Sequence, residues 1–376
     1  MKAEFDTGEI FRRFGQEYER AHDLTGVQRR VLRAVASCRT DVLGGHVEKC
    51  GSCGHTEISY NSCRDRHCPK CQGINSLIWV EARKSELLPV PYFHLVFTIP
   101  SSLDDFVNYD AKKLYNILFS AMSESLLGLF RKEYGATPSV VSVLHTWGSN
   151  MSLHPHIHCI VSGGGLSQDG KRWIHTGGKY LLDVKKLSAS FKSVFLKKLE
   201  SSFQGHLIPP AAVSADWVVF CKKPFAGAEK FVEYIGRYTH RAAISNSRIK
   251  DFNPEAGTGT IEYKDYSNTD ADGVPELKTM ELTAEEFIRR FMLHVLPQGF
   301  RKIRFHGISA GKKRKANLRK CRELFGLPVE KSPTCKVREK DPCPACGGEM
   351  RKTEDIPPDM EKKFIVFRNE LWRNVA

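Results

Sequence analysis

Three histidines at alternate positions open an apolar segment of the chain, namely His154, His156 and His158. Side chains alternate between the two faces of a strand, so these imidazoles can point to one side. Two imidazoles spaced in this way form a clamp for a divalent metal ion. Histidines that only hydrogen-bond at a surface would produce the same pattern, so the motif alone leaves both alternatives open.

Two tyrosines four residues apart form a second candidate. Tyr234 and Tyr238 lie in an expected helix over 228–244, where this spacing places both on one face. Arg237 and Arg241 lie beside them and suit contact with phosphate groups. The tyrosines could act as nucleophiles. Apolar neighbours at the same spacing indicate an ordinary buried stripe equally well.

Four cysteines near the N-terminus lie in two C-x-x-C pairs, which favour a structural zinc site. The pairs are Cys50/Cys53 and Cys68/Cys71. Each pair can present two thiolates from one tight turn, and Zn²⁺ takes four such ligands in a tetrahedron. A redox motif of the thioredoxin type does not explain two paired turns, so we predict that these four residues bind zinc.

Other potential ligands lie in the same segment: Cys38, His46, Cys63 and His67. They could bind a second zinc ion, or they could simply pack around the first. A third C-x-x-C pair, Cys343/Cys346, lies near the C-terminus, where Cys321 and Cys335 are candidate partners. The sequence shows no secretory segment, and the cytosol reduces structural disulfides, so metal binding is favoured over disulfide bonds.

The charge of the chain is concentrated in one stretch. The formal net charge of the 376 residues is +14, and the stretch 299–322 holds ten Lys or Arg and no Asp or Glu. Such a stretch is typical of contact with a polyanion, although a solvated surface would also explain it. The candidate contacts within it are Arg301, Lys302, Arg304, Lys312, Lys313, Arg314 and Lys315.

The elements that must position these residues do not alternate regularly between strand and helix. Strands are expected over 92–99, 139–147 and 156–162, the last two forming the hairpin that carries the histidines. Helices are expected over 103–134 and, behind a capping box, from Thr283. We therefore predict an α+β fold with an antiparallel sheet. No apolar run is long enough to span a membrane, so we expect a cytoplasmic protein.

Several segments together resemble one protein family. LGGHVEKCGSCG, YNSCRDRHCPKCQ, VLHTWGSNMSLHPHIHCIVSGGG and YIGRYTHR are similar to the transposases of the insertion sequence ninety-one family, which belong to the HUH endonuclease superfamily. The resemblance covers about residues 10–325. It implies a helical zinc-binding domain over 1–90, an HUH core over 91–325, and a basic C-terminal region over 326–376 with the last C-x-x-C pair.

The resemblance also implies a mechanism. His156 and His158 would bind Mg²⁺ or Mn²⁺, and Tyr234 and Tyr238 would attack single-stranded DNA to leave 5′-phosphotyrosine and a free 3′-OH, in rolling-circle-like transposition. The expected partners are transposon ends and target DNA, so the protein would lie at the nucleoid when bound to DNA. We expect His145 as the third metal ligand. Its rivals are His94, Asn150 and Glu233.

Two alternatives remain open at this point. The same chemistry could serve plasmid replication or mobilisation, in a replication initiator or a relaxase. A zinc-dependent DNA-binding regulator without catalysis would need only the cysteines and the basic stretch, but it would leave the histidine and tyrosine pairs unexplained.

Overall fold

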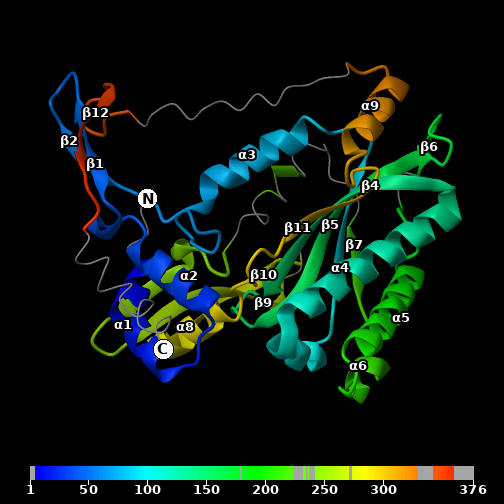
Figure 1. The fold of residues 1–376 in the computed structure, drawn as a ribbon, viewed down its shortest axis with the longest axis horizontal. Helices are drawn as coiled ribbons and strands as arrows, with labels where there is room; N and C mark the ends of the chain where they lie inside the picture. Colours follow the sequence, from blue (N-terminus) through cyan, green and yellow to red (C-terminus); the bar gives the residue numbers. More distant parts are fainter. Residues whose placement is uncertain are drawn as a thin grey trace, which may run out of the picture.

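The hairpin that carries the histidines lies in the middle of a six-stranded sheet (Figure 1). The strand order is β11-β4-β5-β3-β7, β6 pairs with β5, and every pairing is antiparallel. The strands are β3 (Tyr92–Thr98), β4 (Ala136–Trp147), β5 (Leu153–Ser167), β6 (Trp173–His175), β7 (Val219–Lys222) and β11 (Ile303–Gly307). Aromatic and β-branched residues dominate β3 and are frequent in β4, as expected for buried strands.

This structure is a computed structural model. It describes residues 5–177, 180–222, 232–233, 236, 242–270, 273–328 and 342–359.

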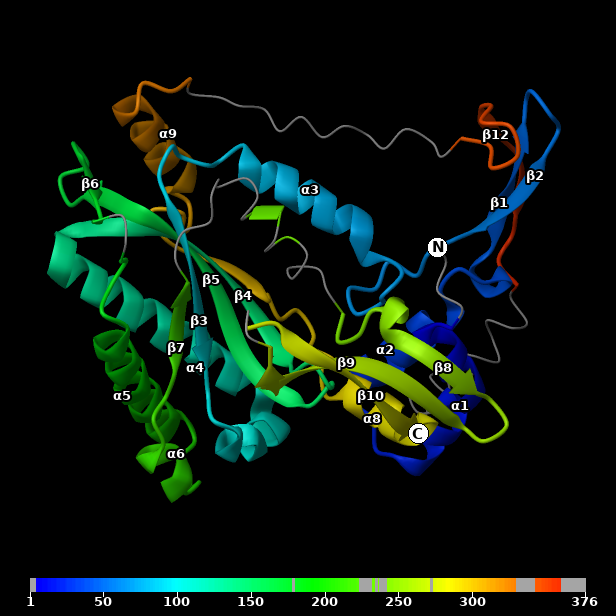
Figure 2. The ribbon, with the colours of Figure 1, turned by 180° about the vertical axis from the view of Figure 1, so that it is seen from behind.

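Two helices cover one face of the central sheet (Figure 2). They are α4 (Asp104–Tyr134), which is kinked at Asp110, and α5 (Val184–Ser202). Ile157, Cys159 and Val161 of β5 point into the core beneath them. Because neighbouring side chains of a strand face opposite ways, the histidines between these residues face the other side.

The other face of the sheet packs against α3 (Gln72–Lys84) and α9 (Arg314–Leu324). Its core includes Val141, Val143 and Ile160 from the strands, with Trp79 of α3 packed against them. The histidine face of the sheet is therefore bordered by the helix that follows the last cysteine of the N-terminal segment.

A second core joins the N-terminus to residues far along the chain. It holds α1 (Thr7–Ala21), α2 (Gly26–Ser37), α8 (Ala284–Met292) and the sheet of β8 (Ile249–Asn253), β9 (Thr258–Thr269) and β10 (Pro275–Thr283). The rings of Phe11 and Phe291 meet edge to face at 5.1 Å within it. The remaining short helices are η1 (Asp41–Leu43), η2 (Ser101–Leu103), α6 (Pro210–Ser214) and η3 (Asn246–Arg248).

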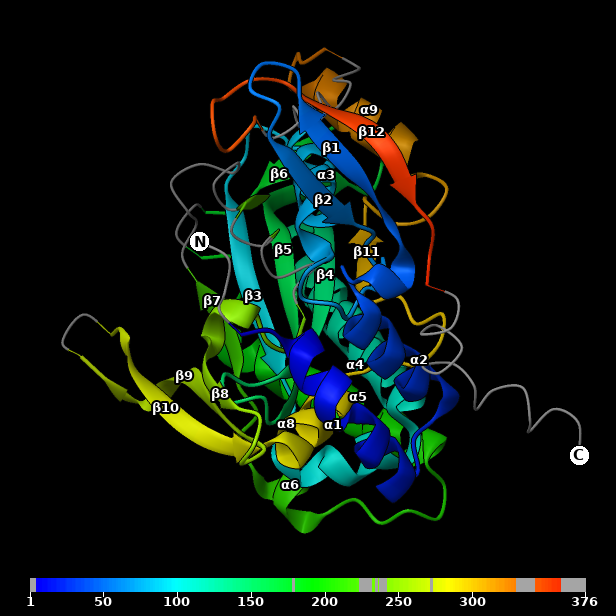
Figure 3. The same cartoon turned by 90° about the vertical axis from the view of Figure 1, so that its left-hand side faces the viewer.

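A third, small sheet combines both ends of the chain (Figure 3). The hairpin of β1 (Gly45–Cys50) and β2 (Thr56–Tyr60) is extended by β12 (Met350–Ile356), which pairs antiparallel with β1.

The predicted α+β architecture with antiparallel sheets is confirmed. Thr283 caps α8 by accepting from the Glu286 N–H at 3.2 Å, but the expected return bond is replaced, because the Glu286 carboxylate pairs with Arg289 and Arg290. Most of the expected helix over 228–244 lies outside the described residues. The three-part division stays a prediction, although elements of all three parts pack together. In the described part of the chain, no helix has the length and apolar character needed to cross a membrane.

Candidate active site

Three histidines converge on the face of the sheet away from α4 and α5. His145 of β4 lies directly opposite His156 of β5, and His158 follows two positions along the same strand. The ring nitrogens that these residues can offer as ligands all lie within 4.8 Å of one another. The structure thus brings His145 together with the predicted pair.

Hydrogen bonds orient the two β5 imidazoles. The Nδ1–H of His156 donates to the carbonyl oxygen of His154 at 2.6 Å, so its Nε2 carries the lone pair and lies 3.1 Å from Nε2 of His158. Burial lowers the pKa of His156 to about 4, and burial with the nearby His145 holds the pKa of His158 well below its usual range. Both rings are therefore neutral near pH 7, as metal ligands must be.

The rival third ligands occupy other places. His94 of β3 lies behind His158, with its Nε2 2.8 Å from the Nδ1 of that ring. Asn150 accepts from the Ser152 N–H in the turn before β5. Glu233 forms an ion pair with Lys84 at 2.6 Å. The set with converging nitrogens is His145, His156 and His158, and His94 can orient the His158 ring from behind.

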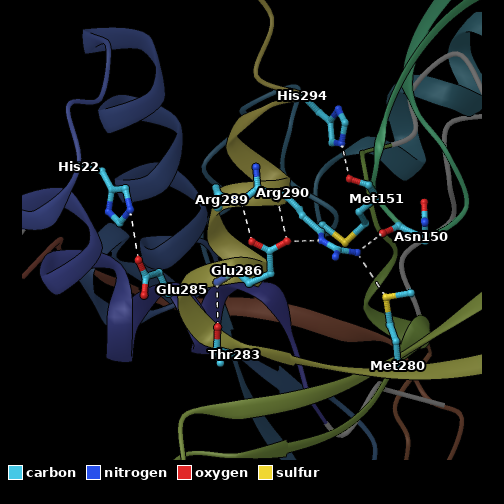
Figure 4. Close-up of polar contacts among 10 residues, drawn as sticks. All are labelled: His22, Asn150, Met151, Met280, Thr283, Glu285, Glu286, Arg289, Arg290 and His294. Carbon is cyan, nitrogen blue, oxygen red and sulfur yellow. Dashed lines mark hydrogen bonds and ion pairs between the residues drawn. The ribbon is translucent and has the colours of Figure 1, made fainter. Parts of the chain in front are cut away.

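Helix α8 holds the turn that precedes the histidine strand (Figure 4). Arg290 donates to the Asn150 carbonyl at 2.9 Å, and the His294 Nε2–H donates to the Met151 carbonyl at 3.0 Å. Met151 is fully buried and has a left-handed backbone with φ of 62°. Such a conformation is unfavourable for a residue with a side chain, so the contacts from Arg290 of α8 and from His294, just after α8, stabilise it. Sequence patterns missed Arg290 and His294, since only the fold brings them to this turn.

The predicted nucleophiles Tyr234 and Tyr238, and the neighbouring Arg237 and Arg241, lie outside the described residues. Two described residues next to them in the sequence, Glu233 and Gly236, contact α3. Ser76 donates to the Gly236 carbonyl at 2.7 Å, and Lys84 pairs with Glu233. Gly236 also lies so close to Val80 that a Cβ there would overlap the valine side chain. The segment that carries the tyrosines is thus tied to α3 at these two points.

One thiol cluster lies where α3 begins. It consists of Cys38, Cys63, Cys68 and Cys71. The Sγ atoms of Cys38 and Cys71 are 3.4 Å apart, and those of Cys63 and Cys71 are 3.6 Å apart. Cys71 also caps the N-terminus of α3. The contacts with the other thiols, Cys38 first, raise the pKa of Cys68 and lower that of Cys71, so the four compete for protons unless a cation binds them all.

A second thiol cluster consists of Cys50, Cys53, Cys343 and Cys346. The Sγ atoms of Cys50 and Cys346 are 3.5 Å apart, and those of Cys53 and Cys343 are 3.7 Å apart. Backbone N–H groups of Cys53 and Ser52 lower the pKa of Cys50 to about 6, which favours its thiolate.

These clusters correct the predicted grouping of ligands. Cys50 and Cys53 do not meet Cys68 and Cys71, because the β1–β2 hairpin carries the first pair away from α3. Cys38 and Cys63, predicted for a separate site, complete the set around Cys68 and Cys71 instead.

The two predicted histidine ligands are also corrected. His67 uses both ring nitrogens elsewhere, because Nδ1 bonds to Asp65 and Nε2 accepts from the Leu296 N–H. His46 lies near Glu48 on β1 and joins neither cluster. Cys321 is not a partner of the C-terminal pair, because it is fully buried against the histidine face of the sheet. Cys335 lies outside the described residues.

The basic stretch is divided between different surfaces. Arg304 faces α4, where its guanidinium lies 4.1 Å from the Phe119 ring, and so it points away from the histidines. Arg314 pairs with Glu86. Burial, with the nearby Arg66, lowers the pKa of Lys302 to about 8. The exposed members of the predicted set are Arg301, Lys312, Lys313 and Lys315.

Solved structures give one similarity. A conjugative relaxase, TrwC, in a metal-bound complex with oriT DNA, aligns over 82% of this chain and 99% of its own, at 10% identity and a TM-score of 0.27. So low a TM-score carries no conclusion about this chain.

Sequence comparisons are more informative. A family described as "Putative transposase" matches residues 139–317, and "Transposase zinc-binding domain" matches residues 10–99. The chain is 43% identical to "Putative transposase y4qJ" of Sinorhizobium fredii (strain NBRC 101917 / NGR234), over 86% of this chain and 85% of that protein. It is 28% identical to "Transposase for insertion sequence element IS801" of Pseudomonas savastanoi pv. phaseolicola, over 77% of this chain and 72% of that protein. The chain therefore belongs to the insertion sequence ninety-one family of transposases.

Proposed function

We propose that this chain is an HUH transposase that nicks and rejoins single-stranded DNA at transposon ends and at the target, through 5′-phosphotyrosine intermediates in rolling-circle-like transposition. The observation that carries the proposal is the convergence of three imidazoles, from His145, His156 and His158, on one face of the central sheet. Tyr234 and Tyr238 are the proposed nucleophiles, because they match the paired tyrosines that the resemblance to the transposase family implies.

The histidine set fits a divalent ion. His156 keeps an Nε2 lone pair toward the other rings, and three imidazoles could hold one side of a divalent ion. Mg²⁺ and Mn²⁺ both favour oxygen ligands, so water and phosphate oxygens would complete the shell of either ion. A bound Mg²⁺ or Mn²⁺ would polarise the scissile phosphate. The protein supplies the position of the ion through the paired strands and the His154 carbonyl.

The covalent step belongs to the tyrosines. The hydroxyl of Tyr234 or Tyr238 loses its proton and its oxygen bonds to phosphorus, while the bond from phosphorus to the 3′ oxygen breaks and that oxygen takes up a proton. The phosphodiester bond is conserved as a tyrosyl ester, so rejoining needs no nucleotide cofactor. A second tyrosine permits a second transfer while the first strand is still held.

The remaining sites would support this chemistry. We propose that zinc bound by Cys38, Cys63, Cys68 and Cys71 fixes the start of α3, and so the segment that α3 contacts. We also propose that exposed basic residues contact the DNA backbone, which makes binding fall steeply with salt. These residues are Arg301, Lys312, Lys313 and Lys315, with Arg237 and Arg241 beside the tyrosines.

The test is covalent capture of DNA. The protein is incubated with Mn²⁺ and single-stranded DNA that carries the element ends, and an SDS-stable protein–DNA adduct is sought. We expect the adduct with the wild type, and none with the double variant Tyr234→Phe/Tyr238→Phe. Tyr266→Phe is the matched control, because Tyr266 is 69% exposed on β9 and should leave the adduct unchanged.

Two outcomes would contradict the proposal. An adduct formed by the double tyrosine variant would assign the covalent bond to another residue. Tight DNA binding with no adduct under any divalent metal would favour a zinc-dependent regulator without catalysis. A third outcome, cleavage of a plasmid origin in place of element ends, would support the same phosphotyrosine chemistry but assign the protein to plasmid replication or mobilisation.

A further inference from the structure

We propose that Cys50, Cys53, Cys343 and Cys346 bind a zinc ion that joins the two ends of the chain into one three-stranded zinc ribbon. This site goes beyond the proposed nuclease function, and it uses a C-terminal cysteine pair that lies outside the matched zinc-binding domain of residues 10–99.

The two cysteine pairs form matching turns. In the first, the Gly54 N–H donates to the Cys50 carbonyl at 3.1 Å; in the second, the Gly347 N–H donates to the Cys343 carbonyl at 2.8 Å. Both glycines are left-handed, with φ of 75° and 74°.

A second main-chain bond repeats in the same way. The Cys50 N–H donates to the carbonyl oxygen of His55, and the Cys343 N–H donates to the carbonyl oxygen of Gly348, both at 2.8 Å. Two turns of one geometry, each presenting two thiols to the other, form the arrangement of a closed structural zinc site.

The sulfur positions fit zinc and exclude disulfide bonds. Zn–S bonds of about 2.3 Å in a regular tetrahedron place the sulfurs about 3.8 Å apart. The measured cross-pair separations, 3.5 Å for Cys50 to Cys346 and 3.7 Å for Cys53 to Cys343, are close to that value. A disulfide would need sulfurs about 2.05 Å apart.

The backbones of the two chain ends approach closely around the cluster. The Gly51 N–H donates to the Glu349 carbonyl at 3.2 Å. A Cβ on Gly348 would lie 2.7 Å from Ser52 Oγ and 3.0 Å from Cys50 Sγ, so a side chain there would displace Ser52 and crowd the Cys50 thiol. The register of β12 on β1 is therefore specified by more than the cysteines.

The small sheet has little else to stabilise it. Its buried cluster consists of Cys50, Cys343 and Met350 alone, whereas the other cores of the described chain hold many large apolar side chains. A three-stranded sheet with so small a core does not bury enough apolar surface to offset the entropy of ordering. A zinc ion can supply that free energy, because its binding is coupled to folding.

Zinc content tests the site in the full-length protein. Native mass spectrometry should find two zinc ions per wild-type chain and one in Cys343→Ser/Cys346→Ser. The variant Cys50→Ser/Cys53→Ser should also retain one zinc ion. The variant with all four substitutions should again retain one, because both cysteine pairs bind the same ion. The control Cys221→Ser alters a thiol of β7 outside both clusters and should keep two.

Thiol reactivity provides a second measurement that needs no variant. Cys53 and Cys346 are exposed, so as free thiols they would alkylate quickly. We expect both to be protected in the wild type and to become reactive together when a chelator removes zinc.

Three results would overturn the proposal. One is a Cys343→Ser/Cys346→Ser variant that binds as many zinc ions as the wild type, and another is a Cys50→Ser/Cys53→Ser variant that does so. The third is fast alkylation of Cys346 before chelation. None of these measurements uses DNA, so they can fail while the proposed nuclease function stands, and the reverse also holds.

Discussion

The histidine cluster and the thiol clusters are assembled from the chain in opposite ways. His145, His156 and His158 come from the two strands of one hairpin, as direct or near neighbours in the sheet. Cys50 and Cys346, in contrast, are separated by 296 positions. A hairpin specifies its own pairing, so a ligand set within it is local. A C-x-x-C turn supplies only two of the four ligands of a zinc site, and the tertiary structure determines which residues supply the other two.

The two kinds of site also differ in what they can influence. The histidines lie on paired strands of the central sheet, and their ring nitrogens converge within 4.8 Å of one another. The cluster around Cys71 lies at the start of α3, and α3 contacts Glu233 and Gly236 beside the proposed nucleophiles. We infer that the first site acts directly on DNA, whereas the thiols of the second act by positioning.

The largest expected effect is loss of the histidine ligands. His156→Ala/His158→Ala should reduce the rate of adduct formation by about 10³-fold or more, because the phosphate loses its cation. Zinc content should not change, because the thiol clusters are separate. The measurement is single-turnover adduct formation with Mn²⁺, alongside zinc analysis.

His175→Ala is the control for this pair, because His175 is exposed on β6 and belongs to none of the ligand clusters among the described residues. If the double variant lost zinc as well as activity, the separation between the two kinds of site would be wrong.

The next effect tests whether α3 transmits the position of the thiol cluster. Gly236→Ala should overlap the Val80 side chain and lower the free energy of unfolding by about 2 kcal/mol, with slower adduct formation. Val80→Ala removes the methyl that would clash, so the double variant should recover much of the loss. Urea denaturation and adduct assays of both single variants and the pair measure this coupling.

Strict additivity of the two substitutions would contradict the contact between α3 and the tyrosine segment. It would leave the thiol cluster as a purely local support.

An effect of similar size on stability separates a supporting histidine from the ligand histidines. Burial lowers the pKa of His294 to about 4, against an ordinary value of 6.5. The folded state favours the neutral ring. The contribution of His294 to the free energy of unfolding is therefore complete above about pH 6.5 and is lost as the pH falls toward 4. The loss between pH 7 and pH 5 should be about 2 kcal/mol.

Urea denaturation of the wild type and His294→Gln at both pH values measures this contribution. Glutamine can still donate to Met151 and accept from Thr146, but it does not titrate, so the variant should be less sensitive to acid. An equal loss in both proteins would show that His294 does not titrate as its burial requires.

The same contrast explains what the sequence could predict. The strands over 92–99 and 139–147 and the histidine pair were predictable, because period-two patterns and local spacing are properties of a short segment. Helix α5 carries Leu187, Phe191, Phe195 and Leu199 at helical spacing, so its pattern was available and overlooked.

Other features depend on distant parts of the chain. The partners of Cys50, and the bonds from Arg290 and His294 to the turn before β5, join segments more than a hundred residues apart. No spacing rule reports such contacts. His67 shows the converse error, because a histidine beside cysteines can be fully engaged by Asp65 and a main-chain N–H.

The smallest effect distinguishes the two thiol clusters from each other, and it rests on the proposed zinc ribbon. Cys38 and Cys68 are fully buried and belong to a large core, whereas Cys53 and Cys346 are exposed beside a small one. Local opening should therefore cost less at the ribbon, and a chelator should remove its zinc about tenfold faster, a difference of about 1.4 kcal/mol.

Release into EDTA with a colorimetric zinc indicator should show two phases in the wild type. Cys343→Ser/Cys346→Ser should lose only the fast phase, because the buried cluster keeps its four ligands. A fast phase that survives this substitution would place the labile zinc at the buried cluster. The exposed chain-end site would then be the more firmly closed of the two, and the ranking by burial would be reversed.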